Sequence, residues 1–156
     1  MAGSPSPARI AYVQAGWHRD LTDRCRRAFD DELAERMPDA VVEHHQVPGA
    51  LEIPLRAQQL AATGRFDAVV ASALVVDGGI YRHEFVAQAV LDGIMRVQLD
   101  SGVPVLSAVL TPHHFHEHVE HRKYFHRHFA VKGTEVAEAC VQTIEGLRRL
   151  EALVTA

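Results

Sequence analysis

Residues 67–76, with the sequence DAVVASALVV, form an almost uninterrupted apolar run of strand length. A strand without polar alternation is buried on both faces, which is typical of a parallel sheet covered by helices on both sides. Three further runs rich in β-forming apolar residues are expected to be strands, at residues 9–14, 40–47 and 103–110. Apolar residues at helical spacing predict helices at 17–37, 53–62 and around 85–97, and a last helix from about 134 to 153.

This alternation of strands and helices predicts an α/β fold in three layers, an α/β/α sandwich. The four strands should form one parallel sheet with the flavodoxin-like order 2-1-3-4. A chain of 156 residues is long enough to form one core without disulfides or metals. We therefore expect a single domain at residues 9–156, preceded by a small, proline-rich and disordered tail at residues 1–8.

Composition excludes several classes of function. The formal net charge of −4 gives no electrostatic reason to expect nucleic acid as a partner. No apolar stretch reaches the ~20 residues of a membrane helix, and the first residues do not resemble a signal peptide. Cys25 and Cys140 lie in helical patterns without a CxxC motif, so we expect two free core thiols and a cytoplasmic protein.

In doubly wound sheets, ligands bind at the carboxyl ends of the strands, and two of these ends carry notable side chains. Trp17 follows the first strand in QAGWH (14–18), where its ring could stack on a planar heterocycle or anchor the helix start in the core. Glu52 follows a Pro-Gly turn in VPGALEIP (47–54). Its carboxylate could accept hydrogen bonds from a ligand, or it could serve as an acid favoured at a helix N-terminus.

The third strand ends in VVDGGIYRHE (75–84), where Gly78 and Gly79 precede a helix start. Free backbone N–H groups and the helix dipole favour an anion such as phosphate there, although two glycines also suit any tight turn. Arg82 and His83 would add a fixed cation and a group that titrates near neutrality. Lys132 could supply a further cation before the last helix, or could be a solvated surface lysine.

Seven of the eleven histidines lie within LTPHHFHEHVEHRKYFHRHF, residues 110–129. Thr111 and Pro112 are a suitable N-cap and first residue for a helix through this segment. Three imidazoles could then share one helix face and bind zinc: His114, His118 and His121. However, HExxH is absent and no cysteine is nearby, so we predict no metal site.

Four motifs taken together resemble the lumazine synthase family: PGALEIP (48–54), VVDGGIYRHEFV (75–86), PVLSAVLT (104–111) and KGTEVAEA (132–139). The resemblance covers essentially the whole chain after the tail. It implies an enzyme of riboflavin biosynthesis that condenses 5-amino-6-(D-ribitylamino)uracil with 3,4-dihydroxy-2-butanone 4-phosphate. It implies no metal and no organic cofactor, and small molecules as substrates.

The resemblance also assigns roles to matching positions. Arg82 aligns with the family's proton-donating histidine, and His83 is its titrating neighbour. With the strand-end residues above, the expected substrate-binding set is Trp17, His18, Ala50, Leu51, Glu52, Leu74, Val75, Val76 and Ser107. The expected phosphate-binding set is Gly78, Gly79, Ile80, His121, Arg122 and Lys132.

The long, histidine-rich segment resembles the second type of this family, a decamer of two facing pentamers with active sites between neighbouring subunits. The histidines would then mark a subunit-contact helix, and we expect the assembly to weaken below about pH 6.5, where imidazoles become charged. A paralogue that binds a lumazine or flavin without synthase activity is the alternative. A phosphoacceptor domain based on Asp77 is not favoured, because VQAGWH (13–18) lacks the acidic pair that such a domain needs.

Overall fold

The computed structural model describes residues 3–76, 82–112 and 119–156, and of residues 119–122 only the backbone. Strands and helices alternate along the chain as predicted. Their bounds are β1 (Arg9–Ala15), α1 (Arg19–Arg36), β2 (Val41–Val47), a short 3-10 helix η1 (Ala50–Glu52), α2 (Ile53–Ala62), β3 (Ala68–Leu74), α3 (His83–Ser101), β4 (Val105–Leu110) and α4 (Val119–Thr155).

The four strands form one parallel sheet in the order β2-β1-β3-β4, which confirms the predicted topology. In the register of the sheet, Ile10 of β1 faces Val42 of β2 and Ala68 of β3. Because all strands run in the same direction, their carboxyl ends meet at one edge of the sheet. The segments that leave this edge are the ones in which a ligand site was expected.

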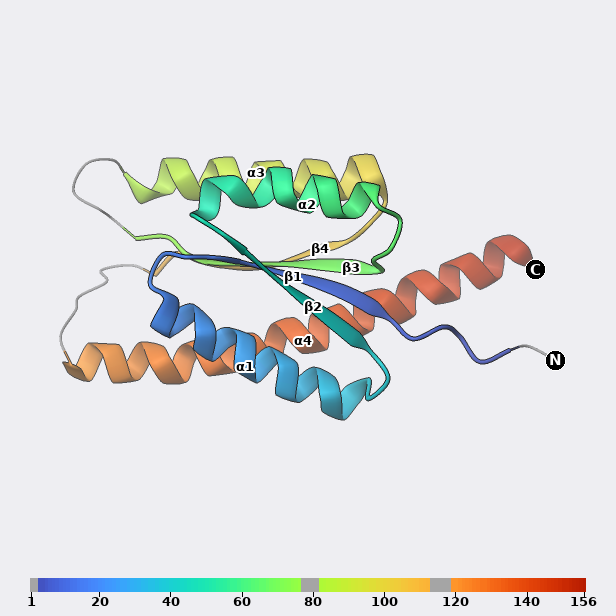
Figure 1. The fold of residues 1–156 in the computed structure, drawn as a ribbon, viewed down its shortest axis with the longest axis horizontal. Coiled ribbons are helices and arrows are strands. Elements are labelled where there is room, and N and C mark those ends of the chain that lie inside the picture. The colour runs from blue at the N-terminus through green and yellow to red at the C-terminus, as the bar shows by residue number, and fades with distance from the viewer. Residues whose placement is uncertain (1–2, 77–81, 113–118) are drawn as a thin grey trace.

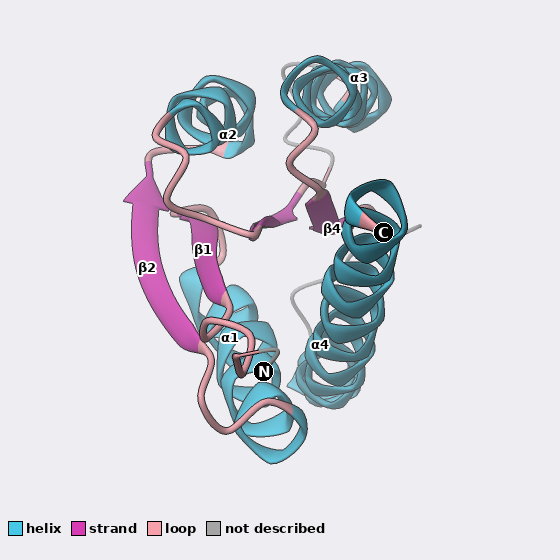
Figure 2. Ribbon diagram, turned by 90° about the vertical axis from the view of Figure 1, so that its right-hand side faces the viewer, coloured by secondary structure: helices cyan, strands magenta, loops and turns pink. Residues whose placement is uncertain are grey.

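Helices cover both faces of the sheet, with α2 and α3 on one side and α1 and α4 on the other (Figures 1 and 2). Side chains that alternate along β1 enter two separate cores, since Val13 packs towards α2 and α3 while Tyr12 packs towards α1 and α4. All seven residues of β3 are buried. The apolar run at residues 67–76 was therefore correctly interpreted as a central strand.

The last helix is longer than predicted. We expected it to begin near Thr134, but α4 runs without interruption from Val119 to Thr155. Gly133 lies inside this helix and is buried against α1, where an added Cβ would lie 2.2 Å from the carbonyl oxygen of Cys25. The glycine thus allows α1 and α4 to pack closely and does not mark a helix boundary.

The N-terminal segment contacts the C-terminal half of α4. Residues 3–8 belong to no helix or strand, and Arg148 Nη2 donates a hydrogen bond to the carbonyl oxygen of Ser6 at 2.7 Å. Ala8 is buried, and its carbonyl oxygen accepts a hydrogen bond from the N–H of Val41 at 2.8 Å. Within the described part of the chain, no helix combines the length and apolar composition needed to cross a membrane.

Candidate functional site

The segments that follow β1 and β2 are joined at the carboxyl edge of the sheet. The N–H of Gly16 lies 3.0 Å from the carbonyl oxygen of Val47 and 3.2 Å from that of Pro48. An added Cβ at Gly16 would lie only 3.1 Å from the Pro48 carbonyl oxygen. This close backbone approach brings QAGWH beside PGALE, as the parallel topology predicted.

Trp17 lies directly on the backbone of Gly49. An ideal Cβ at Gly49 would lie 2.4 Å from Cζ2 and 2.6 Å from Cε2 of the indole, so only glycine leaves room for the ring. The indole is half-buried and packs against the core beneath α2 and α3. The ring therefore packs on the core as an anchor just before α1 and keeps some exposed surface, and its stacking on a heterocycle stays a prediction.

The residues that follow Gly49 form η1, and the three of them differ in exposure. Ala50 is fully buried in the core that also contains Val75 and Val86, whereas Leu51 is 52% exposed. Glu52 is exposed, and its Oε2 accepts a hydrogen bond from the N–H of Gly49 at 2.8 Å. The carboxylate thus closes the turn locally, in the manner of the acid in a capping box.

The end of β3 and the two residues after it belong to the expected substrate-binding set: Leu74, Val75 and Val76. Leu74 and Val75 are buried, on opposite faces of the sheet, and only Val76 is half-exposed. The N–H of Val75 donates to the carbonyl oxygen of Leu110 at 2.9 Å, which joins the ends of β3 and β4. Ser107 is exposed in the middle of β4, where its hydroxyl accepts a hydrogen bond from Val109 at 3.3 Å.

The two candidate catalytic residues lie at the start of α3. Arg82 precedes the helix, with its side chain 72% exposed and its guanidinium 5.5 Å from the ring centroid of Phe85. His83 is the first helical residue, and its side chain is only 18% exposed. Glu84 lies between them, 3.3 Å from Arg82 Nη2 and 3.7 Å from His83 Nδ1.

Glu84 was not assigned a role from the sequence, although it stands in the same motif. Its carboxylate contacts both a permanent cation and an imidazole. A carboxylate beside an imidazole can hold the ring in one orientation. The sequence signal that could have identified Glu84 is its place in a run of three adjacent ionisable residues, RHE (82–84).

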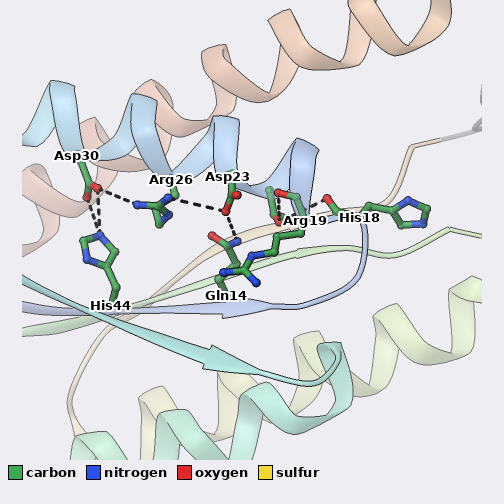
Figure 3. A network of polar contacts seen from close by, with 8 residues as sticks. Gln14, His18, Arg19, Asp23, Arg26, Asp30 and His44 are labelled. Atoms are coloured by element: carbon green, nitrogen blue, oxygen red, sulfur yellow. Dashed lines mark hydrogen bonds and ion pairs between the residues drawn. The ribbon is translucent and has the colours of Figure 1, made fainter. Parts of the chain in front are cut away.

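On the other side of β1, a row of polar side chains joins α1 to the sheet (Figure 3). Gln14 is buried and donates to Asp23 Oδ1 at 2.7 Å, and the same carboxylate lies 3.8 Å from Arg26. His18 begins α1 with a left-handed backbone, at φ 50°, and its imidazole points away from this row (Figure 3). The carbonyl oxygen of His18 accepts hydrogen bonds from the N–H groups of Leu21 and Thr22, at 3.0 and 3.2 Å.

Lys132 lies in the middle of α4, not ahead of the last helix as expected. Its Nζ donates a hydrogen bond to Glu135 Oε2 at 2.8 Å. The remaining positions of the expected phosphate site lie outside the described residues or side chains: Gly78, Gly79, Ile80, His121 and Arg122. Among the described side chains, no group of three histidines, cysteines or acids could hold a metal ion. His114 and His118 also lie outside the described residues.

The described part of this edge thus offers three chemical elements. An indole lies on a glycine backbone, a polar turn follows it, and a half-buried imidazole shares a carboxylate with an arginine. The first two suit a flat, hydrogen-bonding heterocycle, and the third suits proton transfer.

Comparison with known proteins agrees with this chemistry. A family model described as 6,7-dimethyl-8-ribityllumazine synthase matches residues 7–148. A protein of that name from Rhodococcus erythropolis is 59% identical over 91% of this chain and 92% of its own length. A 6,7-dimethyl-8-ribityllumazine synthase 2 from Bradyrhizobium diazoefficiens is 57% identical over 96% of this chain and 90% of its own. A synthase 1 from Caulobacter vibrioides is 35% identical, with 94% of each chain covered.

Proposed function

Because the chain belongs to the 6,7-dimethyl-8-ribityllumazine synthase family, we propose that it condenses 5-amino-6-(D-ribitylamino)uracil with 3,4-dihydroxy-2-butanone 4-phosphate. The products are 6,7-dimethyl-8-ribityllumazine, phosphate and water, and the protein is a transferase of riboflavin biosynthesis. The observation that carries this assignment is 59% identity to a named synthase over 91% of the chain. Relatives named as synthases do not favour the alternative of a binding paralogue.

For the pyrimidine substrate, we propose stacking on Trp17 and binding of the ribityl chain along residues 50–52. The half-buried indole supports this role, because its packing on Gly49 fixes the plane of the ring in advance. His18, Ser107 and the strand end at residues 74–76 complete the proposed pocket. Much of the rate enhancement would come from holding the two substrates in a reactive geometry.

For proton transfer, we propose His83 as the titrating group and Arg82 as the charged group beside it. Arginine stays protonated at physiological pH and is a poor acid or base. His83 is largely shielded from solvent and has Glu84 at 3.7 Å, so its imidazole can be held in one orientation. The phosphate of the second substrate would bind residues 78–80, helped by His121, Arg122 and Lys132.

The assembly we propose is a pentamer, and a decamer of two pentamers, in the cytoplasm. Exposed large apolar side chains occur on β2, α4 and the layer of η1, α2 and α3, and those of this layer are Leu51, Leu55, Phe85, Leu91, Met95 and Leu99. An apolar surface of this kind is typical of a subunit interface. The two free cysteines are both buried, which suits a reducing compartment.

The test follows lumazine absorbance after both substrates are mixed, with the uncatalysed condensation as the baseline. We expect His83→Ala to lower kcat by roughly 100-fold, the usual contribution of a general acid or base. Arg82→Ala should have the smaller effect on kcat. His128→Ala, which removes an imidazole stacked on Tyr124 of α4, is the matched control and should retain wild-type rates.

A wild-type rate equal to the baseline would leave only ligand binding and refute the proposed activity. A larger loss in Arg82→Ala than in His83→Ala would reverse the roles of the two residues. Native mass by light scattering separately tests the pentamer and decamer.

A further inference from the structure

The helices α1 and α4 cover the same face of the sheet (Figures 1 and 2). Side chains of both helices line a groove. Its volume is about 360 Å³, which is large enough for a phosphate ester. The described residues that line it are Arg24 of α1 and Lys123, His126 and Arg127 of α4. Three of these side chains carry a fixed positive charge, and the fourth is an imidazole.

Acidic side chains do not neutralise this groove within the described structure. Among the described side chains, the carboxylate of Asp20 lies 3.7 Å from His126 Nε2. Arg24, Lys123 and Arg127 form no ion pair with any described residue. Three like charges therefore share a concave surface, although the whole chain has a net charge of −4.

Two acidic residues of α1 are engaged on the side of the helix that faces the sheet. Asp23 and Asp30 both turn towards the sheet, where Arg26 lies 3.8 Å from each of them (Figure 3). Asp30 also lies 3.0 Å from Nε2 of His44 on β2. These acids stabilise the contact between α1 and the strands, and Arg24 is left facing α4.

The groove is on a different flank of α4 from Lys132, the lysine proposed for the substrate site. Residues in an α-helix are separated by about 100°. Lys123 and Lys132 are nine positions apart, or about two and a half turns, so they lie on opposite sides of the helix. An anion held by Lys123 and Arg127 would therefore lie on the side of α4 opposite Lys132. Arg122, also proposed for the substrate phosphate, lies one turn from His126, and its side chain is outside the described ones.

We propose that this groove is a second, separate binding site for a phosphate group. A concave surface of one charge concentrates its field and attracts counter-ions of opposite charge. Two guanidinium groups can donate paired hydrogen bonds to phosphate oxygens, and the lysine adds a point charge. The ligand is a small oxyanion, either inorganic phosphate or a phosphate monoester. This site does not depend on the synthase activity.

The test is equilibrium dialysis of the full-length assembly against labelled inorganic phosphate, with ribose 5-phosphate as a competitor. In the double variant Arg24→Gln and Arg127→Gln, we expect one equivalent of bound phosphate per chain to be lost, because the dissociation constant rises roughly tenfold or more for each cation removed. Kinetic constants of the synthase reaction should not change. Displacement by ribose 5-phosphate would identify a monoester site, and its failure an inorganic phosphate site.

A matched control removes two exposed arginines outside the groove, Arg96→Gln and Arg149→Gln, and changes the net charge equally. This control should bind as much phosphate as the wild type. Equal losses in both double variants would show a general charge effect and overturn the proposal. Unchanged phosphate binding in the groove variant would also overturn it, and a smaller native mass in that case would identify the groove as a contact between copies.

Discussion

Replacing Gly133 by alanine should destabilise the protein, although alanine is normally the better helix former. The added Cβ would lie 2.2 Å from the carbonyl oxygen of Cys25 and 2.9 Å from Cβ of Ala28. The first clash is with backbone, so no side-chain rotation relieves it. Because contacting atoms prefer separations of about 3.5–4 Å, α1 and α4 would have to move apart by roughly 1 Å.

The magnitude follows from two opposing terms. Alanine gains about 1 kcal/mol over glycine within a helix. Overpacking a tight contact typically costs about 1–3 kcal/mol, and a clash with backbone belongs at the upper end or beyond. We expect a net loss of about 2 kcal/mol in the free energy of unfolding, which lowers Tm by roughly 4–8 °C for a chain of this size.

Gly146→Ala, in the same helix, is the matched control. The closest atom to its added Cβ is Nη2 of Arg149, at 3.8 Å, so the helix propensity gain should remain and Tm should rise by roughly 2 °C. Both variants are followed by far-UV circular dichroism at one protein concentration, since the Tm of an assembly depends on concentration. If Gly133→Ala is as stable as the wild type, the close contact between α1 and α4 is wrong.

Three further predictions concern buried thiols and the strand-end turn. Burial raises the pKa of the Cys25 thiol and raises that of Cys140 to about 12. Neither thiol should therefore react with a thiol reagent at pH 8 before the protein unfolds, and rapid labelling of the native protein would contradict this. Gly49→Ala should displace Trp17 and raise KM for the pyrimidine substrate while thermal unfolding shows a retained fold; an unchanged KM would argue against stacking. Glu52→Ala should lower stability by about 1 kcal/mol in urea unfolding, whereas Glu52→Gln keeps an acceptor for the Gly49 N–H and should lose less.

The fold was predictable because local patterns and tertiary structure agree. The helix predicted at residues 53–62 has the observed bounds of α2, and the apolar run at 67–76 is the fully buried β3 with one or two extra residues at each end. That QAGWH and PGALE lie near each other followed from the parallel topology, because parallel strands end at one edge. The packing of Trp17 on Gly49 is visible only in the structure.

Two features could not be read from the sequence, since each depends on contacts between distant residues. Gly133 resembles a helix boundary in the sequence, and only the backbone of α1 explains why it lies within a continuous helix. The basic groove combines Arg24 with Lys123 and Arg127, about one hundred positions apart, and no local motif joins them. Such juxtapositions require the packing angle of two helices, which periodicity does not specify.

The length of α4 also has a practical consequence. The helix continues past the amino ends of the strands, so its last turn and the first described residues lie at the end of the molecule opposite the carboxyl ends of the strands (Figure 1). A fluorescent protein or affinity tag fused at either end would project away from Trp17 and His83. The C-terminal turns of α4 would act as a rigid helical spacer between the sheet and a protein fused at the C-terminus.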